Sequence, residues 1–333
     1  MPAKLDRRSF LGTAAMGGIL RLASDADVPA QAAPPAGKHK EPYRGVFIIM
    51  QTPFLKTLEI DEESLRRETD FLIRCGVHGL VWPAGAGETS TLSHDERVRY
   101  SKAVVEEAKG RRPVAIGVHA ANKFEAAQYA REAEKMGADA MIALSQTDGS
   151  ADQGILTDYF TAITSASTLP LIIQVTSPAL TVDYLIGLAR KLPTFRYVKE
   201  EQVPVPPRID RYVAEAKDVL TPMTGGGSRN LLNEMARGSA GTMPGAGFGD
   251  IQAQIWDWYD AGEKKKARDL FGKMLMMAVL EQHTGYVVQK EILRRRGIFT
   301  TVQMRSTNKF SMDRGDLHEL DEIFEVLRPY FRV

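Results

Sequence analysis

The segment Phe195-Arg196-Tyr197-Val198-Lys199-Glu200-Glu201 is a short, mostly apolar run that leads to a lysine. The alternation of Phe195, Tyr197 and Lys199 predicts a buried strand with these three side chains on one face. A lysine at the end of a buried strand is costly unless it is paired or has a use. Burial among apolar groups favours the neutral form of an amine, and a neutral amine is a nucleophile for carbonyl carbon. The structural alternative is an ammonium that reaches solvent beside the two glutamates that follow.

Seven further apolar runs have the pattern of strands and alternate with helical patterns. They are Gly45–Met50, Gly79–Trp82, Pro113–Val118, Ala140–Leu144, Pro170–Val175, Val219–Met223 and Ala240–Met243. Continuous apolar runs are typical of parallel strands buried on both faces. Asp61 has the place of a helix N-cap, and Ser93 with Glu96 forms a capping box. Eight strands separated by helices predict an α/β protein with a (β/α)8 TIM barrel, and an open doubly wound sheet is the alternative.

Three regions are predicted along the 333 residues. Residues 1–42 have the features of a twin-arginine-type signal peptide and a linker, because Arg7-Arg8 precedes the apolar run Leu11–Leu20. This signal predicts a periplasmic protein, and a disordered tail is the alternative. Residues 43–262 are predicted to form the barrel. Residues 263–333 are predicted to form a C-terminal helical extension, because only helical patterns occur there: Lys264–Leu280, Thr284–Arg295 and Asp316–Leu327.

The composition excludes several classes of protein. A formal net charge of +1 gives no electrostatic reason to expect a nucleic-acid partner. After the signal region, no run approaches the roughly 18 apolar residues that a membrane span needs, so no membrane contact is expected of the mature form. The single cysteine, Cys75, excludes an intrachain disulfide. The six histidines form no pair at metal-ligand spacing, so neither a metal site nor a cofactor is predicted.

In barrels of this kind the active site lies at the carboxyl ends of the strands. That rule selects Gln51–Thr52, Pro83–Glu88, His119, Ser145, Gln174, Lys199, Gly225–Gly227 and Thr242–Gly247. Lys199 is the only amine in the set. The tight loop Gly85-Ala86-Gly87 can present backbone N–H groups to a carboxylate. The glycine-rich loops after strands seven and eight, with Arg229 nearby, are predicted to pack closely and contact the substrate through the main chain; a phosphate or second carboxylate is the alternative.

An ordered series of short motifs resembles the dihydrodipicolinate synthase / N-acetylneuraminate lyase family of class I aldolases. The matching pieces are Gly45 with Thr52-Pro53-Phe54, Asp61-Glu62-Glu63-Ser64-Leu65, Gly76-Val77-His78-Gly79-Leu80, Gly87-Glu88-Thr89-Ser90-Thr91-Leu92-Ser93, Gly137-Ala138-Asp139-Ala140 and Val198-Lys199-Glu200. The resemblance covers about residues 43–300. It implies that Lys199 is a Schiff-base lysine that attacks the keto group of a pyruvate-like substrate. It also implies a homotetramer or homodimer, and it places Gly225 and Met243 where the family has main-chain groups near the substrate. Thr52, which the strand-end rule selects, is a further substrate-binding candidate.

The chain departs from the family pattern at several positions. Gly85 and Ala86 stand where the family has two hydroxyl residues, and Gln174 stands where it has a catalytic tyrosine. The arginine expected shortly after that tyrosine is missing from Ser177-Pro178-Ala179, and Ser145-Gln146-Thr147-Asp148 replaces a tyrosine-containing segment. These departures argue against 4-hydroxy-tetrahydrodipicolinate synthase activity itself.

The predicted function is a Schiff-base-forming lyase, an aldolase or a dehydratase, acting on a pyruvate-like 2-keto acid or keto-sugar acid. Lys199 is the predicted nucleophile, Gln174 would orient a hydroxyl or water, and the Gly85-Ala86-Gly87 backbone would bind the carboxylate. Tyr197 is a further catalytic candidate, because its phenol shares the predicted strand face of Lys199; filling of the barrel interior is its alternative role. A non-catalytic periplasmic protein that binds carboxylates or sugar acids is the competing hypothesis for the whole chain.

Overall fold

The computed structural model describes residues 39, 41–145, 152–306 and 311–333, all within the unit Ala33–Val333. The predicted signal peptide lies outside the described residues, as do Gln146, Thr147 and Asp148 of the departing segment after the fourth strand. Among the described helices, none is long and apolar enough to cross a membrane.

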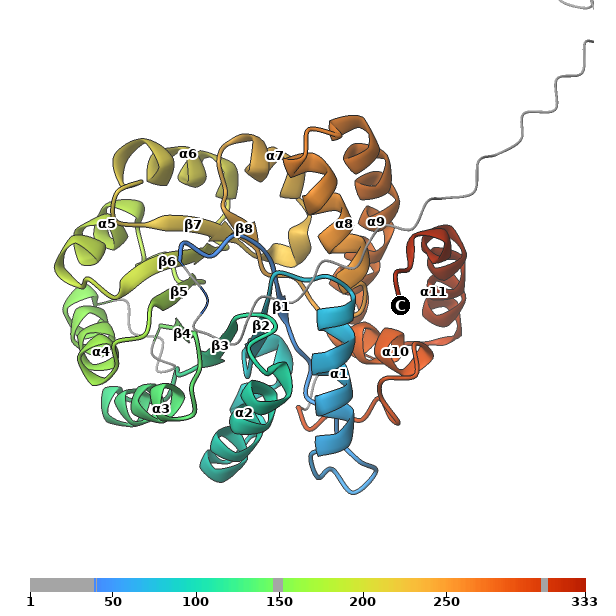
Figure 1. Cartoon of the computed structure of the whole chain (residues 1–333), viewed down its shortest axis with the longest axis horizontal. Coiled ribbons are helices and arrows are strands. Elements are labelled where there is room, and N and C mark those ends of the chain that lie inside the picture. The colour runs from blue at the N-terminus through green and yellow to red at the C-terminus, as the bar shows by residue number, and fades with distance from the viewer. Residues whose placement is uncertain (1–38, 40, 146–151, 307–310) are drawn as a thin grey trace, which may run out of the picture. The chain divides into compact units, whose positions relative to one another are not determined.

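Eight parallel strands close into a barrel in sequence order, which confirms the predicted (β/α)8 fold (Figure 1). The strands are β1 (Gly45–Ile49), β2 (Gly79–Trp82), β3 (Val114–Gly117), β4 (Ala140–Leu144), β5 (Leu171–Val175), β6 (Phe195–Glu200), β7 (Thr221–Thr224) and β8 (Gly241–Thr242). β8 pairs with β1, and this pairing closes the barrel.

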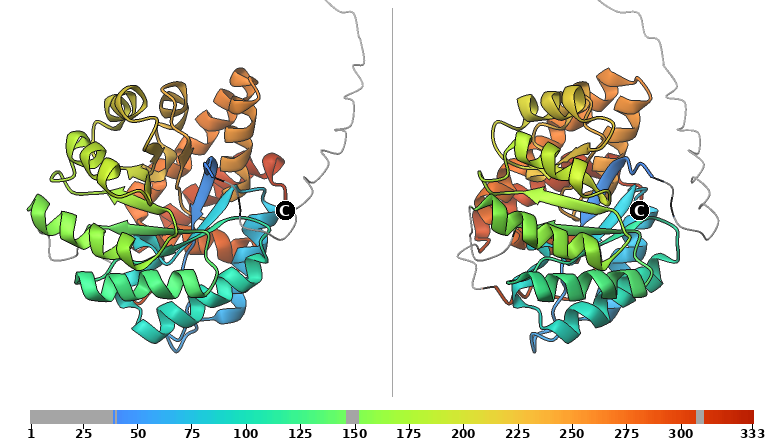
Figure 2. Two further views of the ribbon diagram at one scale, coloured as in Figure 1. Left: turned by 60° about the vertical axis from the view of Figure 1, so that its left-hand side comes forward. Right: turned by 90° about the vertical axis from the view of Figure 1, so that its left-hand side faces the viewer.

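A helix follows each strand and covers the outside of the barrel (Figure 2). These helices are α1 (Glu62–Arg74), α2 (His94–Ala108), α3 (Lys123–Lys135), α4 (Gln153–Ala166), α5 (Val182–Lys191), α6 (Val205–Glu215), α7 (Leu231–Ala236) and α8 (Gly249–Asp260). Asp61 caps α1, since its carboxylate accepts from the Ser64 N–H at 3.0 Å, and the Ser93–Glu96 capping box opens α2. Both caps agree with the sequence prediction.

Three more helices follow the barrel: α9 (Lys264–Thr284), α10 (Val287–Arg295) and α11 (Arg314–Leu327). α9 packs against α8, and α10 and α11 pack against α9 (Figure 1). Four short 3₁₀ turns complete the described elements: η1 (Gly85–Gly87), η2 (Thr89–Thr91), η3 (Gly226–Ser228) and η4 (Arg328–Tyr330). The end of α9 and the α9–α10 junction line the same cavity as the loops at the carboxyl ends of the strands. The helical extension therefore contributes to the barrel mouth.

The apolar side chains form two buried clusters. One fills the barrel interior and includes Tyr197 and Met223; the larger one lies between the strands and the helices. Phe195 belongs to the larger, outer cluster, so the prediction that it shares a face with Tyr197 and Lys199 is wrong. The reason is a register shift, in which Leu171 pairs with Phe195 but the next residue of β5 pairs with Tyr197. The extra residue in β6 reverses the facing of the residue before it.

Candidate functional site

Lys199 lies at the carboxyl end of β6, inside the barrel wall. The strand register places it between Gln174 of β5 and Met223 of β7. The side chain of Lys199 is only 6% exposed, and it lines a cavity of about 310 Å³ at the mouth of the barrel. The amine therefore does not extend into bulk solvent, which removes the structural alternative for this lysine.

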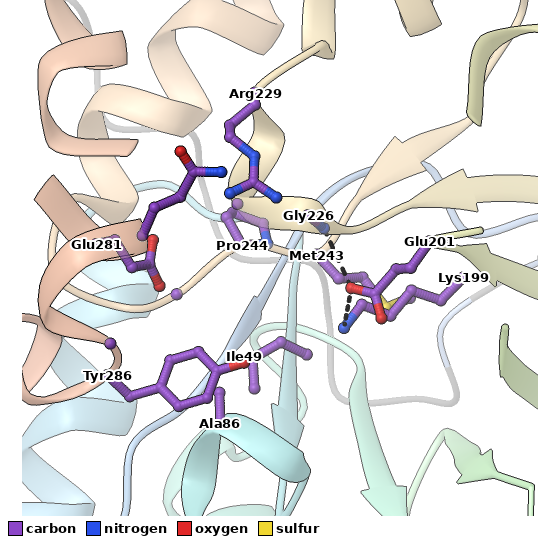
Figure 3. A pocket seen from close by; sticks show the side chains of 14 residues that line it. Ile49, Ala86, Lys199, Glu201, Gly226, Arg229, Met243, Pro244, Glu281 and Tyr286 are labelled. Carbon is purple, nitrogen blue, oxygen red and sulfur yellow. Dashed lines mark hydrogen bonds and ion pairs between the residues drawn. The ribbon is translucent and has the colours of Figure 1, made fainter. Parts of the chain in front are cut away.

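Glu201 is the ion-pair partner of Lys199. One carboxylate oxygen, Oε1, lies 3.3 Å from the amine nitrogen, and it also accepts the backbone N–H of Gly226 at 3.1 Å. The other oxygen, Oε2, accepts the Gln174 side-chain amide at 2.6 Å. Figure 3 shows the Lys199 and Glu201 side chains close together on one side of the cavity. The two residues are two apart in sequence, so the strand period puts both on the same face.

The electrostatics of this group favour an ionised Glu201. Burial acts to raise the pKa of its carboxyl group, but the charge of Lys199 and the hydrogen bonds from Gln174 and Gly226 outweigh burial and hold the pKa below its ordinary value. The neighbouring Glu200 is placed differently. Its carboxylate is fully buried and accepts the Tyr212 hydroxyl of α6 at 2.7 Å, so it does not join the cavity.

Gly225 leaves the space that the Glu201 carboxylate occupies. A Cβ atom built on Gly225 would lie 2.0 Å from Glu201 Oε1 and 2.6 Å from Glu201 Cδ. No side chain fits there unless the carboxylate moves. The glycine-rich turn after β7 thus permits the close approach of backbone and carboxylate, a role that is separate from the predicted main-chain contact with substrate.

The loop after β2 forms another part of the rim. Of the predicted carboxylate-binding residues, Ala86 lines the cavity, Gly85 is exposed and Gly87 is buried. Thr52 lies behind this loop: it is fully buried and its hydroxyl donates to the Gly87 carbonyl. Thr52 therefore holds the loop, which is an indirect role compared with the predicted substrate contact.

The C-terminal helices anchor the same loop from outside the barrel. The residue after the loop, Glu88, is buried and has a left-handed backbone with φ of 59°. Its carboxylate accepts hydrogen bonds from the amine of Lys290 in α10 at 2.5 Å and from the Ser306 N–H at 2.7 Å. Because Lys290 is fully buried, this ion pair fixes the loop to the helical extension without solvent screening.

A second set of polar side chains lines the cavity away from Lys199 (Figure 3): Arg229, Glu281 and Tyr286. Burial raises the pKa of Glu281, against partial opposition from Gln289 and Arg229. Glu281 and Tyr286 belong to the α9–α10 region, so the rule that collects strand ends could not find them. Glu201 was within reach of sequence reasoning, because a residue two positions after the lysine shares its strand face.

Two predicted catalytic residues have surroundings that the sequence did not reveal. Gln174 donates to Glu201, while its side-chain oxygen has no hydrogen-bond partner among the described residues. The Tyr197 hydroxyl accepts the backbone N–H of Tyr43 at 2.8 Å, and Tyr43 precedes β1 at the amino-terminal end of the barrel. The phenol therefore points away from the cavity. This geometry corrects the catalytic assignment of Tyr197 and agrees with its filling of the interior.

The described cavity combines an amine, a carboxylate and a backbone-lined rim, and an amine placed in this way can attack a carbonyl carbon. Met243, one of the predicted substrate-binding residues, also lines the cavity, as do Gly226 and Gly227 of the glycine-rich turn after β7. Within residues 41–145, 152–306 and 311–333, no three His, Cys, Asp or Glu side chains gather as metal ligands would.

Comparison with known proteins gives a consistent family signal. Residues 42–309 match the model of the dihydrodipicolinate synthetase family. A 4-hydroxy-tetrahydrodipicolinate synthase from Rhodopseudomonas palustris is 37% identical over 150 residues, which cover 45% of this chain and 50% of the relative. An L-2-keto-3-deoxyarabonate dehydratase from Azospirillum brasilense is 25% identical over 272 residues, which cover 79% of this chain and 88% of the relative. The chain thus spans about half the length of the first curated relatives that it matches.

Solved structures support the same fold. The crystal structure of dihydrodipicolinate synthase from Rhodopseudomonas palustris superposes with a TM-score of 0.78 at 25% identity, over 85% of this chain and 97% of that one. A prophage protein of the dihydrodipicolinic acid synthase family from E. coli K12, solved in complex with pyruvate, has a TM-score of 0.79 at 21% identity, over 86% and 99% of the two chains. The second likeness concerns the fold alone.

Proposed function

This chain belongs to the dihydrodipicolinate synthetase family, and on that premise we propose that it is a Schiff-base-forming lyase, an aldolase or a dehydratase, acting on a pyruvate-like 2-keto acid or keto-sugar acid. The observation that carries the proposal is the buried amine of Lys199, which lines the cavity at the carboxyl ends of the strands. In a (β/α)8 barrel this is where the reacting atoms are held.

The proposed reaction begins with nucleophilic attack. The Lys199 nitrogen, in its neutral form, forms a bond to the keto carbon while the carbonyl π electrons move to oxygen. Loss of water then gives a protonated imine, which draws electrons from the neighbouring carbon and so permits C–C cleavage, C–C formation or loss of a hydroxyl group. The backbone at Gly85-Ala86-Gly87 is the proposed carboxylate site, because Ala86 lines the cavity and Thr52 holds the loop in place.

The remainder of the substrate would extend toward the second set of polar side chains. Arg229 can pair with an anionic group, and Glu281 and Tyr286 can bond to hydroxyl groups. This pattern favours a substrate with a polar tail. A hydroxylated keto acid and a keto acid with a second carboxylate both have such a tail.

Reductive trapping tests the lyase proposal against its competitor, a binding protein that has lost the chemistry. Incubation with pyruvate and borohydride, followed by peptide mass spectrometry, is expected to give a reduced adduct on Lys199. Lys199→Met should give none, and Lys102, an exposed lysine of α2, should remain unmodified as an internal control. The absence of an adduct with pyruvate and with a panel of longer keto acids would refute the lyase proposal and favour the binding protein.

We also propose periplasmic export and a homodimeric or homotetrameric state. The Arg7-Arg8 pair supports export, and a reporter fused to residues 1–42 should lose export when both arginines become lysine. The exposed apolar side chains Met276 and Val279, 36% and 64% accessible and three residues apart on α9, support burial against another copy. Sedimentation equilibrium that gives a monomer at micromolar concentration would count against this assembly.

A further inference from the structure

Glu201 is the carboxylate at the reacting end of the cavity. Its Oε1 lies 3.3 Å from the Lys199 nitrogen, and its side chain is 20% exposed, on the cavity surface. Among the described titratable side chains of the cavity lining, which also include Arg229, Glu281 and Tyr286, Glu201 alone forms an ion pair with the amine. A base must be within hydrogen-bond reach of the proton that it moves, and Glu201 lies where that condition can be met.

The carboxylate of Glu201 is held in place by hydrogen bonds from two other segments of the barrel. Gln174 donates to Oε2 at 2.6 Å from β5, and the Gly226 N–H donates to Oε1 at 3.1 Å from the turn after β7. The absence of a side chain at Gly225 makes room for it. Neighbouring segments of the barrel thus fix the carboxylate beside the amine, whereas surface ion pairs are usually left free to move.

We propose that Glu201 is the proton carrier of the Lys199 imine and that Gln174 is its positioning residue. The inference rests on the proposed function, because it concerns steps that follow attack by Lys199. It assigns to Glu201 the proton transfer that the family resemblance gives to a tyrosine at the position of Gln174. An amide cannot relay a proton as a phenol does, but it can hold a carboxylate that does so.

The proton moves between the substrate carbon and the carboxylate. In the pyruvate imine, a C–H bond of the methyl carbon breaks and its proton passes to a Glu201 oxygen. The bonding electron pair forms a C=C bond to the former keto carbon, and the C=N π electrons neutralise the iminium nitrogen to give an enamine. In the reverse direction, the Glu201 carboxyl group returns a proton to that carbon. In D₂O the returned proton is a deuteron, so the methyl group of pyruvate exchanges.

This exchange separates a proton carrier from a structural counterion without knowledge of the natural substrate. The assay follows loss of the pyruvate methyl signal by proton NMR in D₂O, beside endpoint borohydride trapping at saturating pyruvate. Glu201→Gln keeps the size and the hydrogen-bonding edge of the side chain but removes the base. We expect the exchange rate to fall by about 100-fold or more, the usual contribution of general acid–base catalysis, while the Lys199 adduct still forms.

Gln174→Leu tests the positioning role through the pH profile. Loss of the amide donor removes one of the interactions that hold the pKa of Glu201 low, while Lys199 and the Gly226 N–H remain. Tyr286 is a further titratable group nearby, and the charge of Glu201 contributes to raising its pKa. The acid limb of the exchange rate should therefore move to higher pH. Gln174→Glu replaces the donor with a second carboxylate and should move the limb further in the same direction.

The outcomes distinguish the two proposals. If both the wild-type protein and Glu201→Gln give the Lys199 adduct, and only Glu201→Gln loses deuterium exchange, the result supports Glu201 as the proton carrier. Exchange by Glu201→Gln within about threefold of the wild-type rate overturns it and leaves the lyase proposal intact. Absence of trapping in the wild-type protein, with pyruvate and with the panel of keto acids, refutes the lyase proposal itself. An unchanged pH profile in Gln174→Leu overturns the positioning role of that residue.

Discussion

Replacement of Gly225 by alanine is the sharpest steric test of the site. The new Cβ would stand 2.0 Å from Glu201 Oε1 and 2.7 Å from Glu201 Cγ. Nonbonded contacts of a Cβ below 3.0 Å essentially do not occur, so the carboxylate oxygen must retreat by about 1 Å. That retreat stretches its contact with Lys199 and the hydrogen bonds from Gln174 and Gly226. The fold should tolerate the change, because the displaced atoms end a side chain that borders a cavity.

The expected loss follows from this displacement. A misplacement of about 1 Å at a catalytic group can cost about 100-fold in rate, or about 2.7 kcal/mol in activation free energy. We therefore expect Gly225→Ala to slow deuterium exchange into pyruvate by about two orders of magnitude. Borohydride trapping on Lys199 should persist, since the lysine is not displaced. Thermal unfolding should show only a small change in Tm.

Gly187→Ala is the matched control. Gly187 lies inside α5, and a Cβ built there meets nothing within 4 Å. Alanine is the better helix former, so this variant should gain about 0.5–1 kcal/mol in the free energy of unfolding and exchange at the wild-type rate. If Gly225→Ala also exchanges at the wild-type rate with an unchanged Tm, the reasoning about Glu201 is refuted.

Three further predictions concern the scaffold around the site. Tyr197→Phe removes the hydrogen bond to the Tyr43 N–H and should lower the free energy of unfolding by about 1–3 kcal/mol in urea denaturation while turnover and exchange stay unchanged; a large loss of exchange would restore Tyr197 as a catalytic residue. Lys290→Met leaves the buried Glu88 carboxylate without its ion-pair partner and should lower the free energy of unfolding by about 3–5 kcal/mol, which thermal denaturation would show as a lower Tm. An unchanged Tm would show that the ion pair does not anchor the loop. Burial raises the pKa of Glu234 to about 7, so the stability that its protonated carboxyl group contributes is fully present below the unfolded-state pKa near 4.5 and is lost as the pH rises through about 7. The free energy of unfolding of Glu234→Gln, measured relative to wild type, should therefore increase by about 3 kcal/mol between about pH 4.5 and 8. A difference that stays constant with pH would contradict the raised pKa.

The proposed lyase chemistry depends on elements that are remote in sequence. The amine comes from β6, the amide that holds Glu201 from β5, and the turn that admits the carboxylate follows β7. The helical extension then lines the cavity from α9 and fixes the loop after β2 through Lys290. Removal of the extension should therefore disturb the site as well as the stability of the barrel.

The order of strands and helices could be predicted from the amino-acid chain alone, because buried parallel strands are continuous apolar runs and helix starts carry capping residues such as Asp61. The same patterns predicted that Lys199 ends a strand, and the barrel rule then placed that lysine at the mouth. The period of two also places Glu201 on the face of Lys199, a signal that the local pattern carries.

The directions and contacts of the side chains, by contrast, depend on closure of the barrel. The register shift in β6 sends Phe195 to the outer cluster, because one extra residue in a strand reverses the facing of its neighbours. Tyr197 points to the amino-terminal end of the barrel, where the Tyr43 N–H binds its hydroxyl. The contacts of Glu201 with Gln174 and Gly226 join segments 27 and 25 residues apart. Local sequence patterns carry no information on such contacts, since they arise only when the strands come together.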